Sequence, residues 1–123
     1  MVYKFINEQM DALAIPYEFG AWTSDVQYPY FVGEFTPEEP MTEDGLEEGV
    51  FLLTGTHRGR FSDLMNAVEK IKSHFDPIHG LRAKTDSGAI AVFFMNCFIV
   101  PTGEAELKRI QINLRVKQWK GAI

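Results

Sequence analysis

Residues 90–100 read Ile-Ala-Val-Phe-Phe-Met-Asn-Cys-Phe-Ile-Val, an apolar run in which Asn96 is the only polar residue. Its β-branched and aromatic residues favour a strand, and apolar side chains occupy both odd and even positions. A strand buried on both faces needs a cover on each. We expect helices to cover one face and a partner subunit the other. Simple alternation places Ile90, Val92, Phe94, Phe98 and Val100 on one face and Ala91, Phe93, Met95, Cys97 and Ile99 on the other.

The chain after this run predicts a turn at 101–103 and then a final strand that alternates cleanly. One face of that strand is apolar and is expected to pack on the core, while the other is polar and positive. Trp119 falls on the polar parity, where a tryptophan is a candidate contact anchor between subunits. The apolar face carries Ile110, Ile112, Leu114 and Val116, and the polar face carries Arg109, Gln111, Asn113, Arg115 and Lys117.

Two amphipathic helices are predicted, over residues 2–13 and 62–75. Pro16 ends the first helix, because a proline disfavours helical geometry in the residue before it. Ser62 is the expected N-cap of the second, and Pro77 and Gly80 end it. The apolar stripes are Val2, Phe5, Ile6, Met10 and Leu13 in the first helix, and Leu64, Met65, Val68, Ile71 and Phe75 in the second.

Further strands are predicted over residues 17–22, 28–36 and 50–58, with a long acidic hairpin loop over 37–49. The order is therefore helix, three strands, helix, two strands. This order predicts one α+β domain over residues 1–123, in which two helices cover one face of a mostly antiparallel sheet of about five strands.

The charge of the chain is divided between its two parts. Residues 1–57 hold 11 acidic side chains and one basic one, a formal charge of −10. Residues 58–123 hold 6 acidic and 11 basic side chains, a formal charge of +5. Opposite charge on two regions lets copies of one protein attract each other head to tail, so the pattern favours assembly.

The composition sets limits on the class of protein. At 46% hydrophobic and 24% charged residues the chain has an ordinary globular composition. Its acidic pI of about 5.1 argues against a general nucleic-acid binder. The single cysteine, Cys97, excludes an internal disulfide and fits a reducing cytoplasm. The first residues predict a helix rather than a signal peptide, and no apolar run is long enough to span a bilayer.

Four chemical sites compete with more ordinary interpretations. His74, Asp76 and His79 are the best metal candidates, but they lack an obvious fourth ligand and sit at a helix end. Cys97 lies within an apolar strand, where inert cysteines occur. Residues 54–60 combine glycine with Arg58 and Arg60 but match no phosphate-binding motif, so we interpret them as a strand end and turn. The acidic loop lacks the ligand spacing of a calcium-binding EF-hand.

The basic face of the final strand raises the question of DNA binding. Arg109, Arg115 and Lys117 are too few to hold a duplex at physiological salt without help, and no aromatic residues are interleaved with them. A solvated or subunit-facing strand is the better interpretation. A DNA-binding accessory protein and a small metal- or ligand-binding domain remain as rival functions.

Several stretches together resemble a known family. They are residues 1–10 (Met-Val-Tyr-Lys-Phe-Ile-Asn-Glu-Gln-Met), 28–34 (Tyr-Pro-Tyr-Phe-Val-Gly-Glu), 39–45 (Glu-Pro-Met-Thr-Glu-Asp-Gly) and 101–114 (Pro-Thr-Gly-Glu-Ala-Glu-Leu-Lys-Arg-Ile-Gln-Ile-Asn-Leu). In these stretches the chain resembles the tail terminators, small tail-completion proteins of long-tailed bacteriophages and prophages. The resemblance extends from the first residue to about Trp119 and is one of overall character. Neighbouring classes of neck, head-tail connector or minor tail protein remain alternatives.

The resemblance implies a structural virion protein without catalytic residues or cofactors, assembled in the cytoplasm of the bacterial host. Such proteins form a ring, expected to be a hexamer, that caps the head-proximal end of the tail tube. The implied partners are other copies of the chain, the tail tube protein and a head-tail connector protein, with DNA only as transient cargo through the ring. No membrane partner is implied.

The charged residues supply a hypothesis for the subunit or tube interface. The acidic loop either reaches the basic region of the adjacent subunit or faces the lumen, where its charge would keep DNA from sticking. The interface residues proposed on this basis are Glu38, Glu39, Glu43, Asp44, Glu47, Glu48, Arg58, Arg60, Arg109, Arg115, Lys117 and Trp119.

Overall fold

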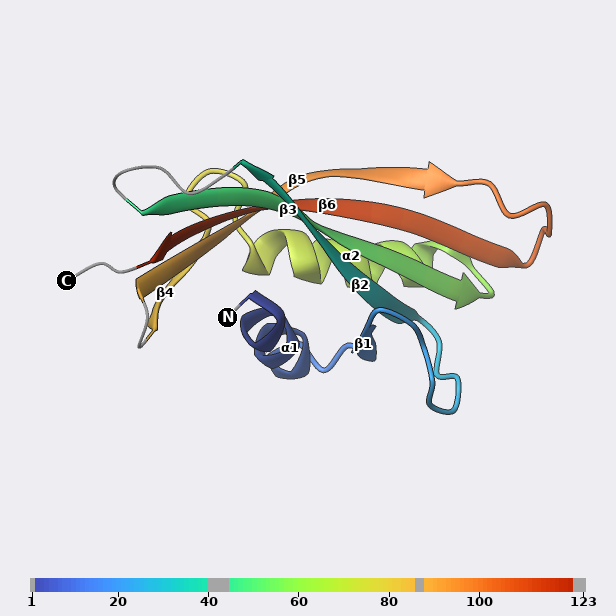
Figure 1. Cartoon of the computed structure of the whole chain (residues 1–123). Helices are drawn as coiled ribbons and strands as arrows, with labels where there is room; N and C mark the ends of the chain where they lie inside the picture. Colours follow the sequence, from blue (N-terminus) through green and yellow to red (C-terminus); the bar gives the residue numbers. More distant parts are fainter. Residues whose placement is uncertain (1, 40–44, 86–87, 121–123) are drawn as a thin grey trace.

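The computed structural model describes residues 2–39, 45–85 and 88–120, which form two helices and six strands (Figure 1). The order is α-β-β-β-α-β-β-β. The elements are α1 (Val2–Ala12), β1 (Tyr17–Phe19), β2 (Tyr30–Glu39), β3 (Leu46–Arg58), α2 (Phe61–His74), β4 (Leu81–Thr85), β5 (Gly88–Val100) and β6 (Leu107–Lys120).

The strands form one curled sheet, a half-barrel, in the order β1-β2-β3-β6-β5-β4. The short β1 pairs with β2 in parallel, and every other neighbouring pair is antiparallel. Both helices lie on the same face of this sheet (Figure 1). The predicted α+β class and the helices on one face are confirmed. Neither described helix is long and apolar enough to cross a membrane.

The core lies between the helices and the sheet, and the predicted stripes supply it. Each helix turns its apolar stripe to the sheet, since side chains three and four residues apart share one helix face. On β6 the predicted apolar face is fully buried, which confirms its alternation. The core residues include Ile6 and Met10 of α1, Leu64, Val68 and Ile71 of α2, Phe51 and Leu53 of β3, and Ile110, Ile112, Leu114 and Val116 of β6.

Several element boundaries differ from the sequence prediction. Helix α2 begins at Phe61 with Arg60 as an N-cap that makes no side-chain hydrogen bond, so the predicted Ser62 cap is wrong. Strand β1 ends at Phe19 because Gly20 takes a left-handed turn with φ of 86°. Strand β4 was not predicted; it pairs with the first part of β5 at one edge of the sheet.

Strand β5 does not keep simple alternation. Its register against β6 shifts between Phe94 and Asn96, which is the signature of a β-bulge. Beyond the shift, Cys97 lies opposite Ile112 and therefore on the helix side, together with Ile99. The predicted faces are thus correct up to Phe94 and exchanged after it, because one extra residue inverts the parity of all that follow.

The acidic hairpin is longer than predicted. Strand β2 continues to Glu39 and strand β3 begins at Leu46, so part of the predicted loop over 37–49 is paired strand. Glu47 and Glu48 lie opposite Gln118 and Lys117 of β6, which gives this end of β3 a neighbour to pair with. Glu43 and Asp44 lie outside the described residues.

Candidate assembly surface

The face of the sheet opposite the helices, called here the outer face, carries the polar row of β6. In antiparallel pairs the residues directly opposite each other share a face, so the register defines this surface. Apolar side chains of β3 and β5 flank the row, among them Leu52 and Phe93. Among the described residues no helix covers this face (Figure 1). The row consists of Arg109, Gln111, Asn113, Arg115 and Lys117, all half-buried.

Two ion pairs join β3 to β6 near the acidic hairpin. The Lys120 Nζ lies 2.7 Å from the Glu47 Oε2, and the Lys117 Nζ lies 3.7 Å from the Glu48 Oε1. Lys117 also lies over the ring of Phe93, 5.8 Å from its centroid. The charges that are separated along the sequence therefore partly neutralise each other within one chain, because the antiparallel pairing sets the acidic start of β3 beside the basic end of β6.

Similar pairing occurs at the other end of these strands. The Arg58 Nη2 lies 3.6 Å from the Glu104 Oε2, and the Arg109 Nε donates a 3.3 Å hydrogen bond to the Thr56 Oγ1. A hydrogen bond to the Tyr28 side chain, more than any nearby charge, raises the pKa of Arg58. The predicted strand end with an exposed Arg58 is confirmed.

The remaining proposed interface residues are dispersed. Arg60 is exposed beside Asp63 at the start of α2, with 3.9 Å between the Nε and Oδ2 atoms. Trp119 is half-buried on the outer face, opposite Leu46 and Ala89. Glu38 and Glu39 end β2, on the far side of β3 from β6. The ten of the twelve residues that the structure describes thus do not form one patch, and Glu47, Glu48, Arg58, Arg109 and Lys117 already have partners within the chain.

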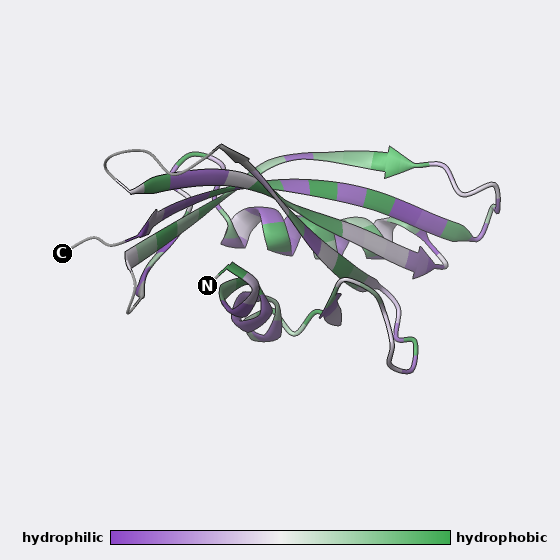
Figure 2. Cartoon of the chain, viewed as in Figure 1, coloured by the Kyte–Doolittle hydropathy of each residue, from purple (hydrophilic) through white to green (hydrophobic). Residues whose placement is uncertain are grey.

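The distal half of β5 is the most exposed apolar part of the sheet. The exposed fractions are 40% for Met95, 51% for Phe98 and 69% for Ile99. Figure 2 shows the end of β5 as hydrophobic, whereas β6 alternates. The sequence prediction did not name these three residues as interface positions, although the two-sided apolar run was the signal that something must cover them.

A second feature that sequence reasoning missed is His57. The imidazole is 8% exposed at the end of β3, and its Nε2 lies 3.5 Å from the Asp63 Oδ2 of α2. The Tyr28 ring stands edge-on, 6.2 Å away between centroids. This contact lies between the end of β3, within the strand predicted over 50–58, and the first turn of α2, and in the described part of the chain neither ring nitrogen has a hydrogen-bond partner.

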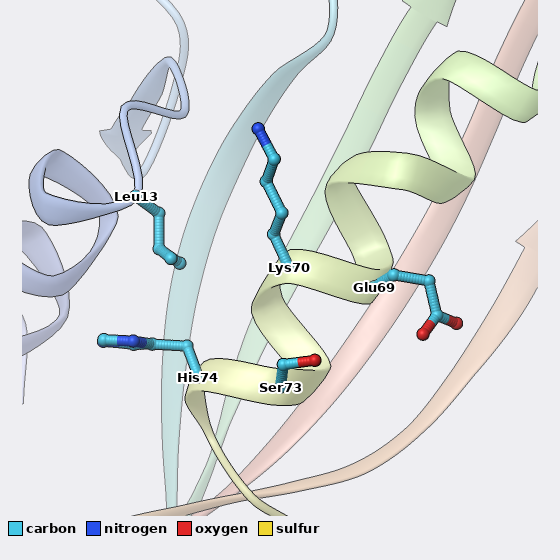
Figure 3. Close-up of a pocket in the computed structure, with 5 residues that line it drawn as sticks. All are labelled: Leu13, Glu69, Lys70, Ser73 and His74. Atoms are coloured by element: carbon cyan, nitrogen blue, oxygen red, sulfur yellow. The ribbon is translucent and has the colours of Figure 1, made fainter.

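Figure 3 shows a shallow hollow between α1 and α2, lined by Leu13, Glu69, Lys70, Ser73 and His74. His74 points towards α1, where its Nε2 is hydrogen-bonded to the Gln9 Oε1 at 2.7 Å. Glu69 and Lys70 point away from His74 and from each other (Figure 3). An acid, a base and a nucleophile must converge to act together. The side chains of this hollow do not converge.

Two of the three metal candidates, His74 and Asp76, have side chains hydrogen-bonded within the chain. Besides the His74 contact, the Asp76 Oδ1 accepts hydrogen bonds from the backbone N–H groups of Ile78, at 2.7 Å, and His79, at 2.9 Å. These hydrogen bonds lower the pKa of Asp76. In the described part of the chain no group of three or more His, Cys, Asp or Glu side chains is disposed to hold a metal ion.

Cys97 is half-buried on the helix side of β5, where it packs against the core. Burial raises the pKa of its thiol. A raised pKa keeps the sulfur protonated at neutral pH, which opposes a role as a nucleophile.

Fold and surface together define a class: a small α+β domain with helices on one face of a curled sheet and an uncovered mixed face on the other. Comparison with known proteins adds no closer identity, since neither a protein-family model nor a curated protein matches the chain.

Proposed function

We propose that the chain is a non-enzymatic structural subunit that assembles with copies of itself into a ring. Following the resemblance to tail terminators, the ring caps the head-proximal end of a phage tail tube, ends its growth and contributes to head-tail joining. The observation that carries the proposal is the exposed apolar segment Met95–Val100 beside an uncovered sheet face, since such surfaces mark interaction sites in folded proteins.

The distribution of charge supports assembly over chemistry. The described ionisable side chains pair along the sheet rather than converge on an enclosed cavity. Residues 2–39, which build α1, β1 and β2, hold seven acidic side chains and one basic one. One side of the sheet is therefore acidic, and a subunit with unlike sides suits a heterologous contact that closes into a ring.

The end of the acidic hairpin retains its two alternative roles. If it attracts the adjacent subunit, charge reversal at Glu43 and Asp44 weakens assembly. If it faces the lumen and keeps passing DNA from sticking, the same reversal leaves assembly intact and increases DNA retention.

The decisive experiment polymerises a phage tail tube protein with and without the purified chain, and measures tube lengths by electron microscopy. Short tubes with a density at one end are expected, together with a ring of six 14.0-kDa subunits in light scattering. Unchanged tube lengths would refute the terminator function. A chain that binds the connector but leaves tube length unchanged would instead be a neck protein, which is the alternative within the same class.

A further inference from the structure

We infer that the open edge of β5, residues 95–100, binds a second copy of this chain through the acidic β1–β2 side of that copy. The inference rests on the proposed ring, and it names the surfaces that close it.

On the side away from β6, no strand in the described part of the chain pairs with this segment of β5. Strand β4 pairs only with residues 88–92 of β5, and the N–H of Phe94 donates to the Phe75 carbonyl at 2.9 Å. Beyond that bond no described strand pairs with this edge. The Phe94 bond points away from β6, and the register after the bulge gives the backbone groups of Cys97 and Ile99 the same outward direction. The edge thus offers hydrogen-bonding groups beside exposed apolar side chains.

Nothing on this edge prevents pairing. Natural edge strands are usually protected by charges or by proline. Residues 95–100 contain neither, and Pro101 comes only after them. An apolar edge of this kind is a template for another strand, so a partner is expected to cover it.

The opposite edge of the sheet has a different character. Strand β1 pairs only with Phe31–Gly33 of β2 and leaves the rest of β2 open among the described strands. The Phe31 N–H and the Gly33 carbonyl point outward to the β1 segment, so by alternation the backbone of Pro37 points outward as well. Pro37 has no N–H, and Glu34 of the same strand is exposed. The β2 edges of two copies are therefore poor partners for each other's strands in a sheet, because their Glu34 side chains repel and each Pro37 lacks an N–H donor.

Two contacts of the β5 edge remain, one with the β5 edge of a second copy and one with its acidic β1–β2 side, and their charges differ. The cations near the β5 edge are Lys72 of α2, whose Nζ lies 5.9 Å from the centroid of the Phe94 ring, and Arg109 of β6, which lies opposite Val100. A contact between two β5 edges would bring these cations together. A contact between β5 and the acidic side of the next copy would instead bring opposite charges together. Because the two edges lie on opposite sides of one sheet, this contact is head-to-tail and continues from copy to copy.

The first test replaces one exposed edge residue. Ile99→Lys is expected to weaken self-association by about tenfold or more. Its unfolding temperature should stay unchanged, because the side chain is 69% exposed. Ile99→Val is the matched control, since it keeps an apolar side chain at the same position of the edge. Light scattering reports mass against concentration. Equal association of Ile99→Lys and the parent, or equal losses in both variants, would overturn the inference.

The second test identifies the partner surface by cross-linking in a Cys97→Ser background. Phe98 and Thr36 both lie on the outer face, so cysteines placed there fit a head-to-tail contact. The Phe98→Cys/Thr36→Cys chain should give a ladder of species beyond a dimer with a short bis-maleimide, while either single cysteine gives none. A dimer from Phe98→Cys alone would mean that two β5 edges pair, and would overturn the inference.

Failure of this contact is distinguishable from failure of the proposed function. A chain that remains monomeric at every concentration overturns the contact, while tube length still decides the terminator function. A ring that persists in Ile99→Lys and still caps tubes preserves the function and rejects this interface.

Discussion

The Tyr17 hydroxyl gives a direct test of the packing between β1 and β2. Its oxygen is buried and has no hydrogen-bond partner in the described part of the protein. A buried polar group without a partner costs about 1–3 kcal/mol. Tyr17→Phe removes that group and keeps the ring, so the free energy of unfolding should rise by about 1 kcal/mol. The corresponding increase in the unfolding temperature is about 4 °C for a domain of this size.

The pH dependence gives the same substitution a second readout. Burial raises the pKa of Tyr17 well above its usual value of 10.0. A group whose pKa is raised in the folded state contributes stability below its unfolded pKa, and loses that contribution as the pH rises towards the folded pKa. The parent should therefore lose stability above about pH 10, and Tyr17→Phe should lose less.

The assay is urea unfolding followed by tryptophan fluorescence, at pH 8 and again at about pH 11. Tyr3→Phe is the control, because Tyr3 is 50% exposed. A loss of 1 kcal/mol or more for Tyr17→Phe at pH 8 would refute the reasoning, since it would mean that the hydroxyl has a partner.

Gly33 provides an independent check on the same site. A Cβ at Gly33 would collide with the Tyr17 hydroxyl and lie 2.7 Å from the Phe51 Cε1. Gly33→Ala should therefore cost about 1–3 kcal/mol through overpacking. In the Tyr17→Phe background the cost should be smaller, because one of the two collisions is gone. Equal costs in both backgrounds would place Tyr17 away from Gly33.

Two further predictions concern the sheet. In the folded protein at pH 8, Cys97 should react with a disulfide reagent at least about tenfold more slowly than in the protein unfolded in urea, because its raised pKa reduces the fraction of thiolate. The rate in the folded protein should increase as the pH rises. Equal rates in the folded and unfolded protein would contradict the burial of Cys97. Glu47→Lys should lower the free energy of unfolding by at most about 1 kcal/mol, since its ion pair with Lys120 is partly exposed. The double variant Glu47→Lys/Lys120→Glu should restore most of that loss. A loss of self-association with unchanged unfolding would show instead that Glu47 acts between copies.

Much of the candidate surface followed from local pattern. The alternation of β6 predicted its basic face, and the two-sided apolar run predicted that a second cover was needed. The pattern did not predict that Glu47 and Glu48 would meet Lys120 and Lys117, because that depends on which strand lies beside β3. A charge division read along the chain says nothing about the order of strands in the sheet.

The sequence by itself determined the elements whose period is regular. The helical stripes of α1 and α2 and the alternation of β6 each bury one face, and that requirement alone fixes an α+β arrangement. Only the tertiary structure decided the features set by pairing between distant segments. The bulge after Phe94 exchanges the faces of β5, and the short β4 leaves the edge beyond it open. Neither has a local signal, since a bulge and a free edge exist only relative to the neighbouring strand.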